Sequence, residues 1–297
     1  ILFLSFSKAA VARIVEASKT QIEKRQRRQL SIQTFHSFCW ELLRSHGYLI
    51  GCPKGRLELL LPHDEKALSK GIKPPKKDEA ASTQWVDWEN ERQRLFREEG
   101  KITFDHFAPK AVELLSRCSL VREQLADCYP IIIVDEAQDT GPDAWRCIEL
   151  LATHSQIICL GDLVPQIFDY LPGVGAERVT HIQESLQRLR SDLGSENNRS
   201  PYTEISIVGD DILSNTVRGS GYVGVSRQMY NPKDDPSKRL RIALGQIYRS
   251  IKKDTGAWPE SVAILTTTGQ GVARISAALN CEVKPVRHKV LFDEAHK

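Results

Sequence analysis

The chain has 297 residues, of which 41% are hydrophobic and 27% are charged, a composition that excludes disordered and fibrous proteins. With 41 Lys and Arg against 38 Asp and Glu, the formal net charge is only +3, so contact with nucleic acid must depend on local basic patches. No apolar stretch reaches membrane-spanning length. Seven cysteines without a CxxC pair predict reduced thiols and a cytoplasmic location, with no zinc site or disulfide framework.

Short apolar runs predict strands along the first half of the chain. They show no clean alternation, which is typical of strands buried on both faces of a parallel sheet. The four runs are residues 1–6, 30–35, 131–134 and 157–162. Helix-like stretches occur at residues 8–18, 36–46, 104–118, 141–154 and 175–191. This alternation predicts an open α/β domain with a mostly parallel sheet.

Residues 47–104 interrupt the alternation of strands and helices. A linker rich in Pro and Lys at 71–82 precedes a charged helical stretch, and such a linker is typical of a boundary between structural units. We interpret the segment as a mainly helical insertion within the α/β domain.

The composition changes again after Ser200, where β-branched residues fall at helical spacing. Ser200 and Pro201 suit the N-cap and first turn of a helix, which predicts that a second domain begins there. A strand at 261–267 and a helix at 271–280 are expected to form one further unit of that domain.

The run IIIVDEAQD (131–139) is an apolar strand that ends in carboxylates. Such carboxylates in a parallel sheet point into the crevice where ligands bind. Asp135 is therefore predicted to hold Mg²⁺ against phosphate oxygens, directly or through water, and Glu136 to orient and deprotonate an attacking water. The alternatives are a solvated acidic strand end and a helix N-cap cluster, in which Asp139 caps the helix that starts near Pro142.

Five segments in chain order resemble the motifs of UvrD/Rep-type superfamily 1 DNA helicases. They are FLSFSKAA (3–10), TFHSFC (34–39), VDEAQD (134–139), GDLVPQIFDY (161–170) and ENNRSP (196–201). The resemblance implies an α/β fold with a RecA-like parallel sheet and helices on both faces. Its expected parts are a RecA-like ATPase domain at 1–46 and 105–200, a helical insertion at 47–104 and a partial second RecA-like domain at 201–297.

The resemblance also implies an ATP-dependent motor that moves 3′ to 5′ on single-stranded DNA and uses ATP and Mg²⁺. In addition to the two carboxylates, Gln166 would sense the γ-phosphate and Arg199 would neutralise charge on the transferring phosphoryl group. Arg249 lies in QIYRS, which looks more like the family's fourth motif letter by letter, but Arg199 follows Gln166 at about the family's spacing. Asn198 replaces the tyrosine that packs on adenine in the family, which leaves base selectivity open.

For DNA, the resemblance implies contacts that tolerate any sequence, because aromatic rings stack on every base. The residues implied are Phe6, Thr34, His36, Phe168 and Tyr170. Core packing is the alternative for Phe6, and the arginine that usually follows the last two aromatics is missing. The basic run KRQRR (24–28) either touches phosphates or forms a solvated face.

Hydrolysis also needs a phosphate loop of the form GxxxxGK[ST], and this pattern does not occur in the sequence. The family's loop lies just upstream of the segment that begins here at Ile1, so we expect it to be encoded upstream and the chain to be a fragment that is inactive alone. Two other interpretations stay open. One is a truncated, non-hydrolysing module that binds single-stranded DNA or a partner protein, and the other is an acyl-transfer enzyme, because SFSK (5–8) fits SxxK.

Overall fold

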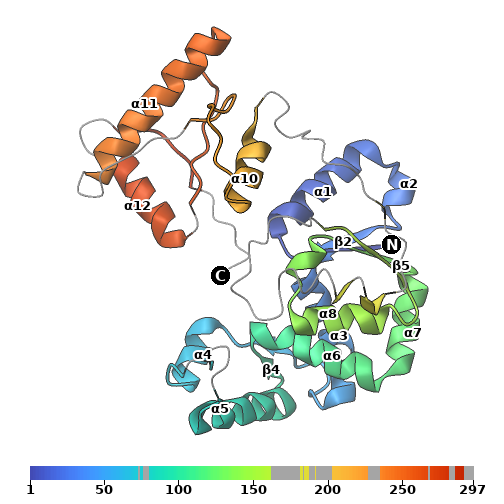
Figure 1. Cartoon of the computed structure of the whole chain (residues 1–297). Coiled ribbons are helices and arrows are strands. Elements are labelled where there is room, and N and C mark those ends of the chain that lie inside the picture. The colour runs from blue at the N-terminus through green and yellow to red at the C-terminus, as the bar shows by residue number, and fades with distance from the viewer. Residues whose placement is uncertain are drawn as a thin grey trace. The chain divides into compact units, whose positions relative to one another are not determined.

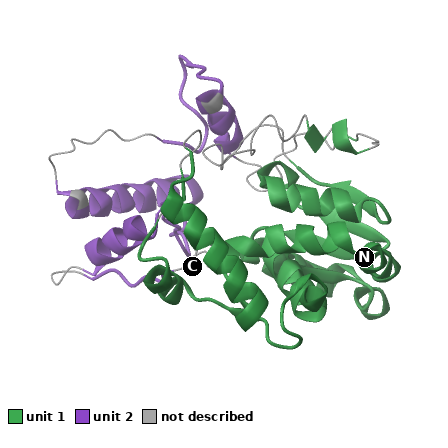
Figure 2. Ribbon diagram, turned by 90° about the horizontal axis from the view of Figure 1, so that it is seen from below, with its two compact units in different colours: residues 1–192, 295–297 green, residues 193–294 purple. Residues whose placement is uncertain are grey.

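The chain is seen in a computed structural model that describes residues 1–72, 74–75, 80–161, 181–182, 184–186, 191, 203–226, 235–266, 268–280 and 285–290. It divides into two compact units, shown in different colours in Figure 2. Unit 1 comprises residues 1–192 with 295–297, and unit 2 comprises residues 193–294. Every strand among the described residues belongs to unit 1.

The main sheet of unit 1 has four parallel strands in the order β2–β1–β5–β6. Their bounds are β1 Leu2–Ser5, β2 Ser31–Thr34, β5 Ile131–Val134 and β6 Gln156–Cys159. The register pairs Ser5 with Thr34 and Leu4 with Val134, so the carboxyl ends of the strands lie along one edge. The predicted parallel α/β sheet is confirmed.

The chain leaves the β1–β5 pair in opposite directions. From β1 it passes through α1 (Lys8–Gln21) to β2, and from β5 it passes through α8 (Pro142–Leu151) to β6 on the other side. Because crossovers between parallel strands are right-handed, α1 and α8 cover opposite faces of the sheet (Figure 1). The boundary between β1 and β5 is therefore a topological switch point, the place where open α/β sheets bind ligands.

The core of unit 1 lies between the sheet and a layer of helices. Leu2, Leu4, Ile132 and Val134 are fully buried on the two central strands, and each such side chain stabilises the fold by about 1.5–3 kcal/mol. Within the layer, α6 (Phe107–Arg117) packs against both α3 (Phe35–His46) and α8. The other helices and helical turns of this part of unit 1 are α2 Lys24–Arg27, η1 Gly47–Ile50, η3 Phe104–His106, α7 Ser119–Cys128 and η4 Ala137–Asp139.

The segment expected to be a helical insertion contains a two-stranded parallel ladder and two helices. The ladder pairs β3 with β4. The elements in chain order are β3 Glu58–Leu59, α4 Pro62–Leu68, α5 Thr83–Arg94, the π-helical turn η2 Leu95–Glu99 and β4 Lys101–Ile102. Leu60, Trp88 and Leu95 form a small core of their own, so this part of the chain folds around its own apolar cluster.

Gly100 allows the chain to return into β4. Its φ of +73° is in the left-handed region, and a Cβ there would lie 2.2 Å from the carbonyl oxygen of Arg56. Only glycine satisfies both conditions, because it has no side chain to clash and adopts positive φ readily.

Arg92 joins α5 to the chain that follows β4. Its side chain is 3% exposed and donates to Asp105 Oδ2 (2.6 Å) and Thr103 Oγ1 (3.4 Å), while also pairing with Glu89. The guanidinium lies 5.1 Å from the centroid of the Trp85 ring, close enough for a cation–π contact. The buried guanidinium therefore holds Thr103 and Asp105, the residues on either side of Phe104.

Unit 2 contains α10 (Ile205–Leu213), α11 (Pro236–Thr255) and α12 (Gly269–Leu279) among its described residues. The guanidinium of Arg241 on α11 donates to the carbonyls of Ala278 (3.2 Å) and Leu279 (3.1 Å). A cation at the C-terminal end of α12 satisfies carbonyls that have no partner within the helix.

Two predictions for unit 2 differ from the structure. Residues 261–266 form no strand, because a strand needs a neighbour for its backbone hydrogen bonds and the described part of unit 2 offers none. The first helix begins at Ile205 rather than Pro201, and Ser200 and Pro201 lie outside the described residues. Glu204, just before the helix, exchanges hydrogen bonds with the backbone of Val223 (3.0 and 2.8 Å), which ties this residue to a distant segment. The helix predicted at 271–280 is present as α12.

The described helices are all too short or too polar to cross a membrane. Six of the seven cysteines lie among the described residues, and these six are free thiols.

We predict that Arg92→Met destabilises unit 1 by about 2–3 kcal/mol, because it leaves the carboxylates around it without their cation. This is just below the usual 3–5 kcal/mol for a broken buried pair, since Asp105 and Glu89 are partly exposed. Urea-induced unfolding, followed by tryptophan fluorescence, measures the loss.

Arg94→Met is the matched control, since Arg94 lies two residues away and pairs with glutamates on the surface. Exposed ion pairs contribute little, so this variant should unfold close to the wild type. Equal losses in the two variants would show that burial of Arg92 has no special effect.

Candidate functional site

Ser5 and Asp135 meet at the switch point of the sheet. Ser5 is fully buried at the end of β1, and its hydroxyl donates to Asp135 Oδ2 (3.2 Å). The backbone N–H of Asp135 donates to the carbonyl of Leu4 (2.8 Å), so the ladder holds the backbone of this residue too. The buried and engaged hydroxyl makes Ser5 unsuited to attack a substrate, which counts against the acyl-transfer interpretation.

Glu136 adopts a backbone conformation that is rare for a residue with a side chain. Its φ is +51° and its ψ is +47°, a left-handed conformation that costs on the order of 1 kcal/mol. The next residue, Ala137, is bonded to the chain just after β6, because its N–H donates to the carbonyl of Leu160 (2.9 Å). The turn thus directs the exposed Glu136 carboxylate out of the strand at the ligand edge.

The side chain of Gln138 holds the Glu136 carboxylate by a hydrogen bond. Its side chain is 2% exposed, and Nε2 donates to Glu136 Oε2 (2.7 Å). Gly161, just after β6, lies so near that a Cβ there would be 2.7 Å from Gln138 Oε1. The amide therefore lies between the acidic turn and the segment that follows β6.

Asp139 is not the N-cap residue of α8. Gly141 is the N-cap residue of that helix and Pro142 its first residue, in agreement with the tolerance of proline in a first turn. Asp139 instead belongs to η4, where its N–H donates to the carbonyl of Glu136 (2.9 Å).

The donor set suits a magnesium ion bound together with phosphate, not an ion held by protein alone. Among the described residues, no cluster of three or more His, Cys, Asp or Glu side chains could enclose a metal. Mg²⁺ in nucleotide sites takes one or two carboxylates and completes its shell with phosphate oxygens and water. Asp135, held by Ser5 at the sheet edge, fits that requirement.

Phe6 and His36, two of the residues predicted to touch DNA, each stack on another ring beside this edge. Phe6 follows β1 and stacks on the buried Phe35, with ring centroids 5.3 Å apart. It is half-buried and packs against the core, as the alternative reading of this residue expected. The ring of His36 stacks on Phe104 with centroids 4.2 Å apart and an interplanar angle of 13°.

Thr34 is the N-cap residue of α3. Its hydroxyl accepts from the N–H of Ser37 (3.1 Å) and caps α3, which holds His36 in the first turn of that helix. Burial lowers the pKa of His36 below its usual value, so the ring is neutral at pH 7 and stacks as an aromatic group.

Phe104 was not found from the sequence. It lies in η3 and is 44% exposed, although its ring contacts His36. The two residues are far apart in the chain, and only the fold brings them together. An aromatic residue at the end of the inserted segment is the one signal that the sequence offers.

Four predicted site residues lie outside the described residues, and so does the tyrosine replacement at Asn198. They are Gln166, Phe168, Tyr170 and Arg199. Their roles stay predictions.

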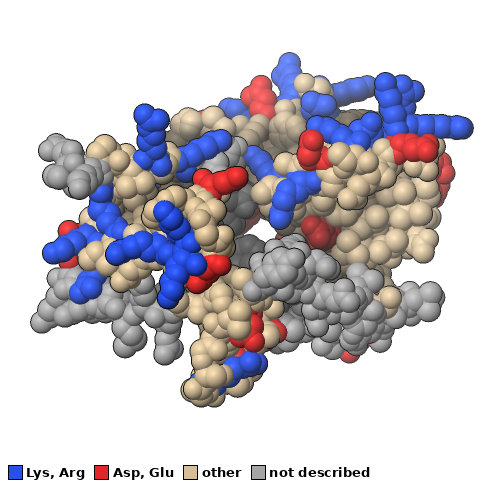
Figure 3. Space-filling view, turned by 90° about the horizontal axis from the view of Figure 1, so that it is seen from above, with Lys and Arg blue, Asp and Glu red and all other residues tan. Residues whose placement is uncertain are grey.

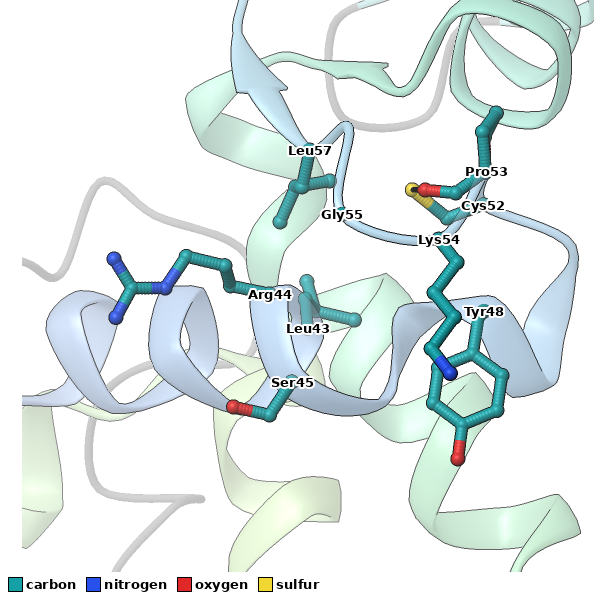
Figure 4. Close-up of a pocket in the computed structure, with 9 residues that line it drawn as sticks. All are labelled: Leu43, Arg44, Ser45, Tyr48, Cys52, Pro53, Lys54, Gly55 and Leu57. Carbon is teal, nitrogen blue, oxygen red and sulfur yellow. Dashed lines mark hydrogen bonds between the residues drawn. The ribbon is translucent and has the colours of Figure 1, made fainter.

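A separate cavity of about 190 Å³ lies at the other end of α3 (Figure 4). Its lining includes Leu43, Tyr48 and Lys54, with the Lys54 ammonium 5.5 Å from the centroid of the Tyr48 ring. Leu43 is nine residues from Thr34, roughly 13 Å along the helix axis. The cavity is therefore distinct from the acidic edge of the sheet.

Comparison with known proteins identifies the family to which this chain belongs. The chain matches the model of the UvrD/REP helicase N-terminal domain over residues 1–86 and 56–173. The two matches together span more than half of the 297 residues and include both carboxylates and both aromatic pairs.

Curated relatives are similar over long stretches of the chain. DNA helicase II of Haemophilus influenzae is 24% identical over 276 residues, which cover 80% of this chain and 36% of the relative. The putative ATP-dependent DNA helicase YjcD of Bacillus subtilis is 23% identical over 199 residues, covering 62% and 26%. The exonuclease/helicase subunit RexA of Lactococcus lactis matches over 85 residues at 29% identity, covering 28% and 7%.

The chain thus spans about a third of the length of its DNA helicase II relative and smaller fractions of the other two. The parallel sheet, its acidic switch point and the family match lead to one identification: the chain belongs to the UvrD/REP helicase family.

Proposed function

We propose that the whole protein to which this chain belongs is an ATP-dependent DNA helicase that moves 3′ to 5′ along single-stranded DNA. The observation that carries the proposal is the acidic turn after β5, held at the switch point by Ser5 and Gln138. The names of the relatives, two of which are DNA helicases, support the same activity.

In this proposal the acidic turn serves ATP hydrolysis. Asp135 binds the Mg²⁺ that accompanies ATP, and Glu136 orients the attacking water and accepts its proton. When bound, Mg²⁺ offsets the negative charge of the phosphates. Gln166 senses the γ-phosphate, and Arg199 neutralises charge on the phosphoryl group as it transfers.

DNA binds the neighbouring part of the same edge. Phe6, Thr34, His36, Phe168 and Tyr170 form the proposed contact surface. We add Phe104 to it, because the exposed ring stacked on His36 offers a flat face to an unpaired base.

The register of the sheet supports coupling between the two sites. Ser5 lies opposite Thr34 on one side, and Leu4 lies opposite Val134 on the other. With strands about 4.8 Å apart, the proposed DNA and ATP residues follow strands only about 10 Å from each other. A shift of the Glu136 turn on hydrolysis can therefore reach the DNA side through a single intervening strand.

We further propose the domain division expected from the sequence. It assigns residues 1–46 and 105–200 to the ATPase domain, 47–104 to the insertion and 201–297 to a partial second RecA-like domain. The separate apolar cluster around Trp88 supports the inserted part.

A second candidate function is a module that binds single-stranded DNA or a partner protein without hydrolysing ATP. The absence of GxxxxGK[ST] from the sequence favours it for this chain alone. The two functions differ in one measurement, namely DNA-stimulated ATP hydrolysis by the whole protein.

We predict that the 297-residue chain alone hydrolyses ATP at the background rate, since it has no lysine-bearing phosphate loop. In a whole protein that contains such a loop, hydrolysis should depend on single-stranded DNA, and Glu136→Gln should lower kcat by about 10²–10⁴-fold. Release of inorganic phosphate measures both rates. A Glu136→Gln protein that keeps its full rate would exclude Glu136 as the base.

In the whole protein, Gln138→Met tests how the Glu136 carboxylate is held. Methionine fills the space of glutamine but donates no hydrogen bond, so kcat should fall about tenfold while the affinity for a fluorescent ATP analogue stays within twofold. Thermal unfolding is the control, because a lower melting temperature with unchanged kcat would assign Gln138 a structural role alone.

We predict that Phe104→Leu weakens binding of a labelled oligo-dT strand, because leucine keeps apolar volume but has no flat face. Loss of one base stack, worth about 1–3 kcal/mol, corresponds to a roughly 5- to 150-fold higher Kd. Tyr48→Leu, an exposed aromatic at the distant cavity, is the matched control and should bind as the wild type. Fluorescence anisotropy measures all three proteins, and equal affinities would remove Phe104 from the DNA surface.

A further inference from the structure

A strongly basic surface covers α1 and α2 of unit 1. Residues 8–29 contain seven Lys or Arg and two Glu, whereas the whole chain is almost balanced, with 41 against 38. We call these residues the α1–α2 surface. Figure 3 shows Lys and Arg side chains over the part of unit 1 where these helices lie, and others over unit 2.

The cations of this surface are held on short, well-defined elements. Lys24, Arg25 and Arg28 are exposed on or next to α2. Backbone hydrogen bonds from Arg27 N–H to Glu23 (3.0 Å) and from Leu30 N–H to Arg27 (3.1 Å) close the turn that leads into β2. The charges are therefore presented by an ordered part of the fold.

Three exposed cations of this surface pair with no acidic side chain among the described residues. Lys19, by contrast, pairs with Glu16 (2.7 Å). Lys24, Arg25 and Arg28 take part in none of the ion pairs of the described residues. Like charges gathered on an ordered surface repel one another, and an anionic partner relieves that repulsion.

The surface differs in chemistry from the proposed single-strand site. Residues 8–29 contain no Phe, Tyr or Trp, while the neighbouring edge carries Phe6 and the His36–Phe104 pair. Unpaired bases need aromatic rings to stack on. Duplex DNA buries its bases and presents a dense array of phosphates, one charge per about 1.7 Å of axis, which a purely cationic surface suits.

We propose that the α1–α2 surface binds the phosphate backbone of duplex DNA. The inference rests on the proposed function in one respect, namely that DNA is the substrate. Because α1 begins at Lys8, two residues after Phe6, the start of the surface adjoins the proposed single-strand site. The 14 residues of α1 extend about 21 Å to α2, which precedes the amino end of β2. A duplex would therefore run from the sheet edge along α1 to the cations of α2.

The test uses the full 297-residue chain and two labelled probes, a blunt 20-base-pair duplex and an oligo-dT strand. The variant Lys24→Gln/Arg25→Gln/Arg28→Gln removes three exposed cations. It should bind the duplex at least tenfold more weakly at low salt. The slope of log K against log salt should become about 2–3 units less steep, since each phosphate contact contributes roughly 0.9.

The matched control is Lys101→Gln/Arg117→Gln/Arg146→Gln, which removes the same charge from cations that are ion-paired elsewhere in unit 1. It should leave the duplex affinity and the salt slope close to those of the wild type. An equal loss in both triple variants would mean that total charge, not this surface, governs binding, and would overturn the proposal.

The oligo-dT strand separates this inference from the proposed function. Loss of duplex affinity with single-strand affinity within twofold supports the surface. A wild-type chain that binds oligo-dT but not the duplex overturns the surface and leaves the proposed function standing. A chain that binds the duplex through these cations but not oligo-dT supports the surface and contradicts the proposed single-strand site.

Discussion

The pairing of β1 with β5 is the constraint on which the site depends. It places Leu4 opposite Val134, so that Ser5 and Asp135, 130 positions apart in the chain, share a hydrogen bond at the sheet edge. A slip of one residue in this register would turn the Asp135 side chain to the other face and separate it from Ser5. The complete burial of Leu2, Leu4, Ile132 and Val134 opposes such a slip, because it would move all four out of their places in the core.

The turn after β5 shows how the fold maintains an unfavourable backbone. Glu136 occupies the left-handed region without being glycine, and its neighbours compensate with directed contacts. Ala137 is hydrogen-bonded to Leu160, and Gln138 fills the space that the missing side chain of Gly161 leaves. The acidic turn is therefore held against Leu160 and Gly161, which follow β6.

The sequence was sufficient for features set by local pattern. The buried strands of the sheet follow from apolar runs, and the start of α8 follows from Pro142. It was insufficient where an element needs a distant partner. Residues 261–266 have strand-like composition but no strand beside them, and Glu204 is tied to Val223, so α10 starts at Ile205. The contacts of Gln138 with Gly161 and of Phe104 with His36 depend on topology, and no spacing in the chain encodes them.

The parallel pairing of β3 with β4 has a consequence for how this architecture can vary. Glu58 lies opposite Lys101, and Leu59 lies opposite Ile102, so the chain between them leaves and returns at points about 5 Å apart. A substitute of another size whose ends are equally close could be grafted there without moving the host sheet. Because the entropy of loop closure grows slowly with length, the length of a graft would matter less than the loss of Phe96 from the core and of the contacts of Arg92. The β3–β4 ladder thus marks a place where the inserted segment can change in size while the site at the carboxyl edge of the main sheet stays the same.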